Sequence, residues 1–387
     1  MFVGSCAPPG RGLPGGLTAE ASCPLNVTGA LAPVFQCPAR ITLMTDTFPL
    51  ADLGWASDFL RQLTLDELAT LTPCRISAVH RSRIEALCPT GPLSLLPPAG
   101  LSTAEIAVGD WGLCDGTRLL RLLARRSTLA RRAAGTGADR QLIAANVDTL
   151  FIVTSCNADF NPARIERYLA LARAAGVAPV LVLTKADIPP DPAAWQDRAA
   201  MIDRRVPVVA LDARAPGDRL ADWCRPGQTV ALLGSSGVGK TTLANALTGA
   251  DQATAAIRED DAKGRHTTTG RHLHRLVQGG WLIDTPGMRE LRLSDAGAGI
   301  AATFDDLDAL AGACRFADCR HQTEPGCAVQ AAIAAGTVDP ARLGRWQKLR
   351  REDRINSETL AEAHARDRAF GKMTRAALRD KSRLRGA

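Results

Sequence analysis

Residues 230–241 read VALLGSSGVGKT, an apolar run followed by a complete match to the pattern G-x-x-x-x-G-K-[ST]. The matching positions are Gly234, Gly239, Lys240 and Thr241. The apolar run predicts a strand and the following TTLANALTG predicts a helix, which together are the setting that a phosphate-binding loop needs. The alternative is a glycine-rich turn without a ligand, and the correct flanking elements argue against it.

Such a loop binds phosphates through its backbone N–H groups, and the helix N-terminus adds positive potential. Lys240 is expected to reach the β- and γ-phosphates, and the hydroxyl of Thr241 is expected to bind Mg²⁺. The predicted nucleotide contacts in this segment are Gly234, Ser235, Ser236, Gly237, Val238, Gly239, Lys240, Thr241 and Thr242.

Two downstream segments fit the same site. WLIDTPGMRE places Asp284 at the end of an apolar strand, where a second Mg²⁺ ligand belongs, and Gly287 can donate its N–H to the γ-phosphate. GRHTTTG, residues 264–270, offers threonines that can reach Mg²⁺ and sense hydrolysis. Thr267, Thr268 and Thr269 cannot be ranked, and Thr268 is taken as the candidate. The alternatives are an ordinary turn and a Thr-rich strand start.

The base is indicated by VLVLTKAD, which ends a predicted buried strand with Thr184, Lys185 and Asp187. In the pattern N-K-x-D the Asp accepts hydrogen bonds from guanine N1–H and the 2-amino group, and the Lys stem covers the ring. Here Thr184 stands where the pattern has Asn, so the polar side chain at the first position of the motif is shorter. T-K-x-D alone also fits an ordinary helix entrance. Beside a phosphate loop it favours guanine.

The order of the motifs is unusual. In ordinary GTPases the phosphate loop comes first, but here the base-reading motif precedes it. A circular permutation explains this order, since the termini of a domain usually lie close together. Strands alternate with helices over residues 140–292, which predicts an α/β domain with a mostly parallel sheet. One helix is well marked: Asn161 can cap it, Pro162 fits its first position and Gly176 can end it.

The segments on either side have different patterns. Residues 1–43 are rich in Gly and Pro, so we expect a disordered leader with the natural start near Met44. Residues 44–73 form an N-terminal extension. Short strand patterns over residues 74–135 predict a small β-barrel. Residues 293–387 are expected to form a helical C-terminal domain.

Within that C-terminal domain, residues 314–327 read CRFADCRHQTEPGC, in which Cys314, Cys319, His321 and Cys327 have the spacing C-x4-C-x-H-x5-C. Three thiolates and one imidazole predict a closed tetrahedral zinc site of the structural kind. The alternative, packing cysteines, is disfavoured by four soft ligands within fourteen residues.

Charge is concentrated at the end of the chain. The formal net charge is +7, and residues 341–387 hold 14 Lys/Arg against 6 Asp/Glu, a local balance of +8. A polyanion such as nucleic acid is the leading partner class, although a solvated helix face would look the same. No apolar run approaches the roughly 20 residues that span a bilayer. We therefore expect a cytoplasmic, monomeric chain without membrane association.

Together these motifs resemble the small ribosomal subunit biogenesis GTPase family (RsgA, also called YjeQ). The resemblance runs from about residue 70 to the end, through IAANVDTLFIV, NPARIERYL, LTKAD, GSSGVGKTTL, GRHTTT, DTPGMRE and CRFADCRHQTEPGCAV. It implies an N-terminal OB-fold, a circularly permuted GTPase domain that binds GTP or GDP, and a zinc-binding C-terminal domain. It also implies GTP hydrolysis stimulated by the small subunit, whose late maturation and factor release the family assists.

The resemblance also raises a question about catalysis. Many GTPases orient water with a Gln after D-x-x-G, but Met288 stands there, so His266 becomes the candidate beside Lys240 and Asp284. His266 could equally contact ribosomal RNA. Partners implied by the resemblance are 16S rRNA and ribosomal proteins, with phosphate contacts expected from Arg342, Arg345, Lys348, Arg350, Arg351 and Arg354.

Two other function classes remain open at this point. One is a P-loop ATPase or nucleotide-metabolising enzyme, which Asp187→Asn would distinguish because only a guanine reader changes its base preference. The other is a zinc-dependent RNA-binding module with a vestigial nucleotide site. Intact Lys240, Thr241 and Asp284 argue against that second class.

Overall fold

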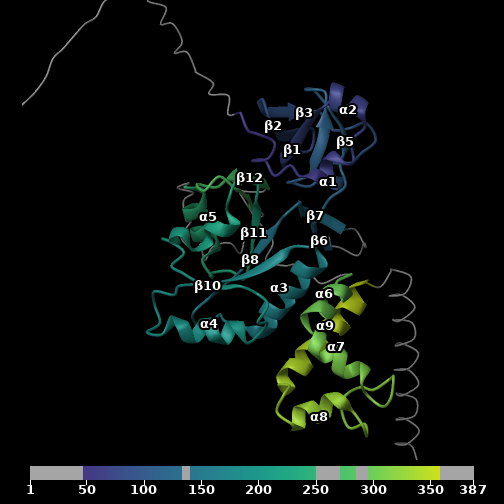
Figure 1. Ribbon diagram of the computed structural model, residues 1–387, viewed down its shortest axis with the longest axis vertical. Helices are drawn as coiled ribbons and strands as arrows, with labels where there is room; N and C mark the ends of the chain where they lie inside the picture. The colour runs from purple at the N-terminus through teal and green to yellow at the C-terminus, as the bar shows by residue number, and fades with distance from the viewer. Residues whose placement is uncertain (1–46, 133–139, 250–270, 285–294, 358–387) are drawn as a thin grey trace, which may run out of the picture. The chain divides into compact units, whose positions relative to one another are not determined.

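Figure 1 shows the computed structural model, which describes residues 47–132, 140–249, 271–284 and 295–357. The expected leader and Met44 lie outside these ranges, as do His266, Thr268 and Gly287. No helix within the described ranges is long and apolar enough to cross a membrane.

Five short strands build a barrel near the N-terminus. Its elements are α1 (Ser57–Leu60), α2 (Leu65–Thr70), β1 (Thr72–Val79), β2 (Ile84–Cys88), β3 (Gly91–Leu95), η1 (Thr103–Glu105), β4 (Trp111–Cys114) and β5 (Leu119–Leu122). The order β3-β2-β1-β4-β5 is antiparallel throughout. The N–H of Leu119 donates to the carbonyl of Leu96 at 3.0 Å, and a parallel bridge joins Leu96 to Arg118. This contact closes β3 onto β5, so the predicted OB-type barrel is confirmed.

A mixed sheet follows the barrel and a two-stranded hairpin. The hairpin consists of β6 (Thr128–Arg132) and β7 (Arg140–Ala145). The strands of the sheet are β8 (Thr149–Ser155), β9 (Ala178–Thr184), β10 (Val208–Ala210), β11 (Thr229–Leu233), β12 (His272–Arg275) and β13 (Trp281–Asp284). Their order is β10-β9-β8-β11-β13-β12, parallel except for β12.

Burial explains the position of the central strand. All seven residues of β8 are buried, and they read TLFIVTS, a continuous apolar run typical of a parallel strand covered on both faces.

The described helices of this domain are α3 (Pro162–Ala174), α4 (Pro192–Ala200), η2 (Gly217–Trp223) and α5 (Lys240–Thr248). The side chain of Asn161 caps α3 by accepting from the N–H of Arg164, and Gly176 follows its end with φ 71°. These predicted helix signals are confirmed.

One buried arginine joins the barrel to this sheet. Arg75 on β1 is 1% exposed and donates to the carbonyl of Leu53 at 2.5 Å and to the hydroxyl of Thr229 at 2.6 Å. Burial lowers the pKa of its guanidinium to about 10. Beside it, β1 pairs with β12 at Ala78 and His272, so the barrel and the α/β sheet form one continuous ladder.

Within residues 295–357, which the structure describes, the C-terminal part has four helices: α6 (Gly297–Thr303), α7 (Asp305–Gly312), α8 (Ala328–Ala334) and α9 (Pro340–Ser357). Helix α6 packs closely on α3, because a Cβ atom at Gly299 would lie 2.1 Å from the carbonyl oxygen of Ala170. Helix α9 buries Leu343, Trp346 and Leu349, which are three residues apart and share one face.

Helix α9 also corrects one expectation from the sequence. Arg342 and Arg345 were expected to contact RNA, but both bind the carboxylate of Glu166 on α3, which is fully buried. A buried carboxylate needs such partners, because an unpaired charge in the interior is strongly unfavourable. The expectation is wrong for these two arginines, whereas Lys348 and Arg351 are exposed. Residues 358–387 of the basic tail lie outside the described ranges.

Candidate functional site

The carboxyl ends of the parallel strands meet at one edge of the sheet, which is where ligands bind in α/β folds. Strands β9, β11 and β13 end at Thr184, Leu233 and Asp284. The pairing of Ala231 with Ile283 brings Asp284 beside the end of β11. The fold therefore gathers at a single edge the three motif segments that the sequence singled out separately.

The phosphate loop has the conformation that its glycines predict. Gly237 and Gly239 have φ angles of 78° and 90°, a region that side chains with a Cβ atom rarely adopt. Gly234 is required for a different reason: a Cβ atom there would lie 2.2 Å from the carbonyl oxygen of Val153 on β8. The loop then opens α5, whose first residue is Lys240, so the helix N-terminus points its N–H groups at the loop.

Two cationic side chains converge on one residue of this loop. The Lys240 ammonium donates to the main-chain carbonyl of Ser235 at 2.5 Å. The Arg164 guanidinium, from the first turn of α3, donates to the Ser235 hydroxyl at 2.9 Å. The sequence pattern gave no sign of Arg164, because its contact depends on how α3 packs beside the loop. Both contacts fix the position of Ser235 within the phosphate loop.

The base-reading loop is tied directly to the phosphate loop. Thr184 is fully buried, and its hydroxyl lies 2.6 Å from the carbonyl oxygen of Val238 and 3.0 Å from that of Thr154. These contacts tie the end of β9 to the phosphate loop through the Thr184 side chain. Lys185 follows with φ 57°, a strained value for a residue other than glycine, and such strain is typical of functional loops.

Asp187 projects outward and already has a cationic partner. Its carboxylate accepts from Arg214 at 2.7 Å, and Arg214 in turn binds Asp212 at 2.9 Å. Asp212 and Arg214 follow β10, so a fourth strand end contributes to this edge. This segment was not among the predicted site residues, although its position after a parallel strand was a usable signal.

The two proposed magnesium ligands are both exposed at the same edge. Thr241 lies in the first turn of α5, and Asp284 ends β13 opposite His272 of β12. A hydroxyl and a carboxylate are the hard oxygen ligands that Mg²⁺ prefers. The other predicted contributors, Thr268 and Gly287, lie outside the described residues.

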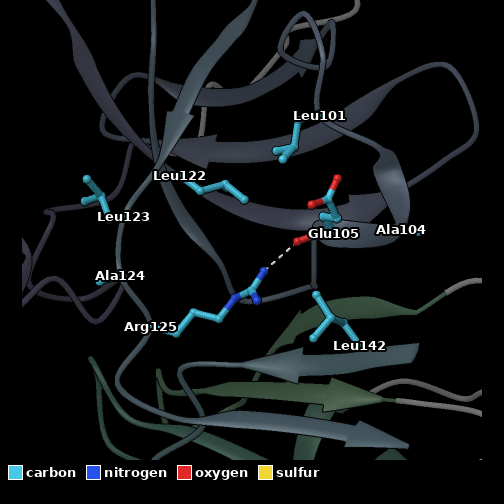
Figure 2. Close-up of a pocket in the computed structure, with 8 residues that line it drawn as sticks. All are labelled: Leu101, Ala104, Glu105, Leu122, Leu123, Ala124, Arg125 and Leu142. Carbon is cyan, nitrogen blue, oxygen red and sulfur yellow. Dashed lines mark hydrogen bonds between the residues drawn. The ribbon is translucent and has the colours of Figure 1, made fainter. Parts of the chain in front are cut away.

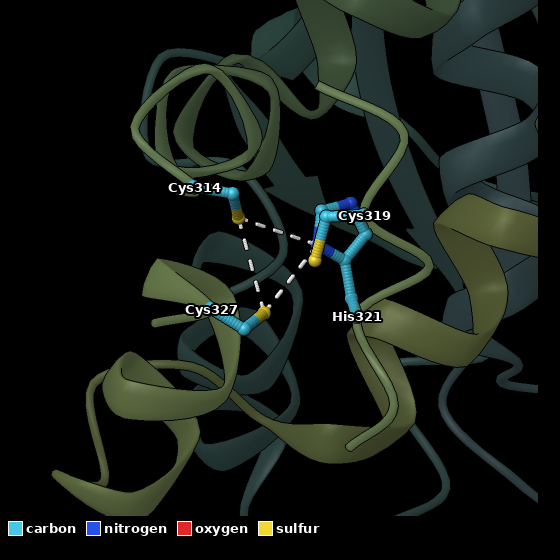
Figure 3. A group of neighbouring side chains, drawn as sticks. All are labelled: Cys314, Cys319, His321 and Cys327. Atoms are coloured by element: carbon cyan, nitrogen blue, oxygen red, sulfur yellow. Dashed lines mark hydrogen bonds between the residues drawn. The ribbon is translucent and has the colours of Figure 1, made fainter. Parts of the chain in front are cut away.

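A second cluster lies in the C-terminal part. The ligand atoms of Cys314, Cys319, His321 and Cys327 all lie within 4.8 Å of one another (Figure 3). The Sγ atoms of Cys314 and Cys327 are 3.8 Å apart, and each lies 3.5 Å from Nδ1 of His321. A tetrahedral zinc ion with its usual bond lengths needs S···S and S···N separations of about 3.8 and 3.5 Å. Cys314, His321 and Cys327 therefore fit such an ion, and Sγ of Cys319 lies within 4.8 Å of their ligand atoms.

The surroundings of the cluster hold its ligands in place. The side chain of Gln330 donates to the carbonyl of His321 at 2.6 Å, and the Gln330 backbone N–H donates to Sγ of Cys327 at 3.4 Å. The ring of Trp346 on α9 packs on His321 with centroids 5.6 Å apart. Burial lowers the pKa of His321, which favours the neutral imidazole that a metal ion requires.

A separate pocket of about 530 Å³ lies between the barrel and β7 (Figure 2). Its polar groups are already used by the fold: Arg125 donates to the buried carboxylate of Asp110 at 2.6 Å and to the carbonyl of Glu105 at 2.7 Å. The rest of the lining is largely leucine and alanine. We therefore keep the strand ends, and not this pocket, as the candidate nucleotide site.

Comparison with known proteins identifies the family. A family model described as "RsgA GTPase" matches residues 122–294. A relative from Mesorhizobium japonicum, named "Small ribosomal subunit biogenesis GTPase RsgA", is 56% identical over 318 residues, which cover 80% of this chain and 91% of that protein. This chain belongs to the RsgA GTPase family. A second RsgA, from Vibrio parahaemolyticus, is 50% identical and covers 88% of this chain and 96% of its own length.

Solved structures agree with the RsgA fold. The crystal structure of YjeQ from Thermotoga maritima matches with a TM-score of 0.54 at 21% identity, over 72% of this chain and 97% of that one. The structure of YloQ, titled a circularly permuted GTPase, matches with a TM-score of 0.51 at 21% identity, over 76% and 96%. The predicted permutation is confirmed, and as an RsgA this chain is a GTP-binding GTP hydrolase.

Proposed function

We propose that this RsgA GTPase acts in the biogenesis of the small ribosomal subunit, and that the subunit stimulates its hydrolysis of GTP. One observation carries the proposal: relatives with 50–56% identity over most of the chain bear the name of a small ribosomal subunit biogenesis GTPase. Hydrolysis would then release the protein and other assembly factors from the rRNA. Such a role would place the chain in the cytoplasm.

In this proposal the strand-end site holds the nucleotide. The backbone of residues 234–242 and the ammonium of Lys240 bind the phosphates, while Asp187 reads guanine and the stem of Lys185 covers the base. Thr184 supports the reading indirectly through its 2.6 Å bond to Val238. That bond joins the two loops that must recognise opposite ends of one nucleotide.

Thr241 and Asp284 would hold the magnesium ion, whose charge offsets that of the phosphates when it is bound. His266 remains the proposed residue that orients the attacking water, because the apolar side chain of Met288 cannot position water. A Thr of residues 267–269 and the backbone of Gly287 complete the proposed contacts to the γ-phosphate.

The Cys/His cluster is proposed to hold one structural zinc ion. All four positions around the ion would be filled by protein, so no place is left for a reacting water. The exposed residues Lys348, Arg350, Arg351 and Arg354 are proposed to contact rRNA phosphates. Arg350 stacks on Trp346 at 4.8 Å, which would hold its charge close to the zinc module.

The proposal is tested by GTP turnover of the whole chain with and without purified small subunits. Subunits should raise kcat for GTP by at least about tenfold, and ATP turnover should stay at background. Equal GTP turnover with and without subunits would contradict stimulation. Comparable ATP turnover would contradict guanine reading.

A further inference from the structure

The first turns of α3 connect the phosphate loop to the C-terminal helices. Arg164 binds the hydroxyl of Ser235 in the phosphate loop at 2.9 Å. Two and three residues later, Glu166 and Arg167 bind side chains of α9. Figure 1 shows α3 lying between the sheet and the group of helices that contains α9. One short segment therefore contacts both parts of the molecule.

The contact at Glu166 is a rigid clamp. Its carboxylate is fully buried and accepts from Arg345 at 2.6 and 3.2 Å and from Arg342 at 3.0 Å. A buried carboxylate cannot exchange these bonds for water, so separating α9 from α3 would leave a charge without a partner. Arg167 adds an ion pair with Glu352, further along the same helix. The start of α3 and the middle of α9 must therefore move together.

The same face of α9 touches the Cys/His cluster. Trp346 is next to Arg345 in the chain, is 1% exposed, and packs on His321 at 5.6 Å. A displacement of the cluster would thus reach α3 through α9. Each step is a direct contact between buried or half-buried side chains.

At the other end of this connection, Arg164 is well placed to act on the phosphate loop. Ser235 is the only hydrogen-bond partner of its guanidinium within the part of the chain that the structure describes. An arginine has five N–H donors, so four remain. Lys240 holds the carbonyl of the same Ser235. The position of α3 therefore influences the residue on which both cations converge.

We propose that Arg164 is a positioning residue of the phosphate site, and that the helices around the Cys/His cluster influence GTP hydrolysis through it. The path of contacts runs from the cluster to α9, then to Glu166 and to the first turn of α3. The inference rests on the proposed stimulation by the small subunit. Arg164 sets the position of Ser235 and so of the backbone N–H groups that bind phosphate. Binding of the C-terminal module to the subunit changes that position through the clamp.

The test compares kcat and KM for GTP, with and without small subunits, in the whole chain. Arg164→Gln should lower the stimulation factor, the ratio of the two kcat values, by about tenfold, with KM changed by less than about threefold. Arg164→Lys should retain part of the stimulation, because lysine keeps the charge but lacks the planar, forked arrangement of N–H donors. Arg198→Gln, on the exposed face of α4, is the matched control and should leave the factor unchanged.

A second variant acts outside the nucleotide site. Glu352→Gln removes the outer ion pair with Arg167 and spares the buried clamp, so the protein should fold. Its turnover without subunits should equal that of the wild type, and its stimulation factor should fall by about threefold or more. If the subunit stimulates the wild type and both Arg164→Gln and Glu352→Gln have the wild-type stimulation factor, the inference is overturned and the proposed function still stands. An unstimulated wild type would overturn the proposed function and the inference with it.

Binding supplies an independent readout. A non-hydrolysable GTP analogue must change the affinity for the subunit by the same factor by which the subunit changes the affinity for the analogue. If this coupling runs through Arg164, the factor depends on that side chain. In Arg164→Gln that factor should approach one, whereas a purely structural role would lower both affinities and keep the factor. Retention of the wild-type factor would count against the inference.

Discussion

The hydroxyl of Thr184 lies 2.6 Å from the main-chain carbonyl oxygen of Val238, and this contact joins the base-reading loop to the phosphate loop. The two residues are 54 positions apart in the chain, and both are fully buried. A Cβ atom at Gly239 would lie 3.6 Å from the same hydroxyl, so the loops are in van der Waals contact here. A short side chain suits this close approach.

Removing only that hydroxyl should loosen the nucleotide site. Thr184→Val keeps the shape of the side chain but leaves the Val238 carbonyl without a donor, which costs about 1–3 kcal/mol. We expect GDP affinity to fall by about fivefold or more, measured by titration of a fluorescent GDP analogue. Thr184→Ser keeps the hydroxyl and should bind nearly as the wild type does. Equal affinity in the Val and Ser variants would contradict the role of the tether.

A second prediction concerns base recognition by Asp187. Asp187→Asn replaces one acceptor oxygen by a donor, so guanine loses charge-assisted hydrogen bonds and GTP affinity should fall by about a hundredfold. Xanthosine triphosphate, which carries a carbonyl where guanine has its amino group, should bind the variant better than GTP does. Competition titrations with both nucleotides measure the switch. A variant that still prefers GTP would show that another residue reads the base.

Two glycines of the phosphate loop should respond differently to the same substitution. Gly234→Ala places a Cβ atom 2.2 Å from the carbonyl oxygen of Val153, a contact that only a backbone shift can relieve. Gly237→Ala meets no atom within 4 Å and adds only the strain of its positive φ, about 1–2 kcal/mol. In urea unfolding, Gly234→Ala should lose clearly more stability than Gly237→Ala. Equal losses would mean that φ alone requires both glycines.

Local patterns were sufficient to predict several elements correctly. Asn161 and Pro162 marked the start of α3 because a cap and a first-turn proline act within three residues. The spacing from Cys314 to Cys327 predicted a cluster for the same reason: one short loop brings its ligands together. The phosphate loop needed only a strand, its glycines and a helix, all contiguous in the chain.

Contacts between distant segments could not be predicted in this way. The charge run that includes Arg342 and Arg345 does not reveal which side of the helix is buried, and so it gave no sign of Glu166, about 180 residues earlier. Arg164 was equally hidden, because its partner Ser235 follows 71 residues later. Such pairs depend on how helices dock on the sheet, which the spacing of residues along one helix does not determine.

A fourth prediction concerns the metal. Cys319→Ser replaces one of four ligands and should reduce bound zinc from about one ion per chain to well below one, with a lower melting temperature, because ion binding and local folding are coupled. Elemental analysis of the purified protein measures the ion. Cys88→Ala, a buried cysteine in the barrel, is the control and should keep its zinc. Loss of zinc in both variants, or in neither, would contradict the assignment.

The last prediction concerns acid stability through Asp203, which accepts hydrogen bonds from Arg173 at 2.6 Å and Arg205 at 3.0 Å. Burial alone would raise the pKa of this carboxyl, but the arginines outweigh it and hold the pKa at about 2, below its usual value of 3.8. Because the folded pKa is the lower one, the stability it contributes is present above about pH 4 and is lost as the pH falls toward 2.

Asp203→Asn should therefore lower the free energy of unfolding by about 2 kcal/mol at pH 7. The difference from the wild type should shrink between about pH 4 and pH 2, because protonation makes the wild-type carboxyl resemble the amide. Urea unfolding at a series of pH values measures both curves, and Asp197→Asn, exposed on α4, controls for net charge. If the difference in unfolding free energy stays constant down to the lowest pH, the loss arises from disrupted packing around Asn and not from the lost ion pairs with Arg173 and Arg205.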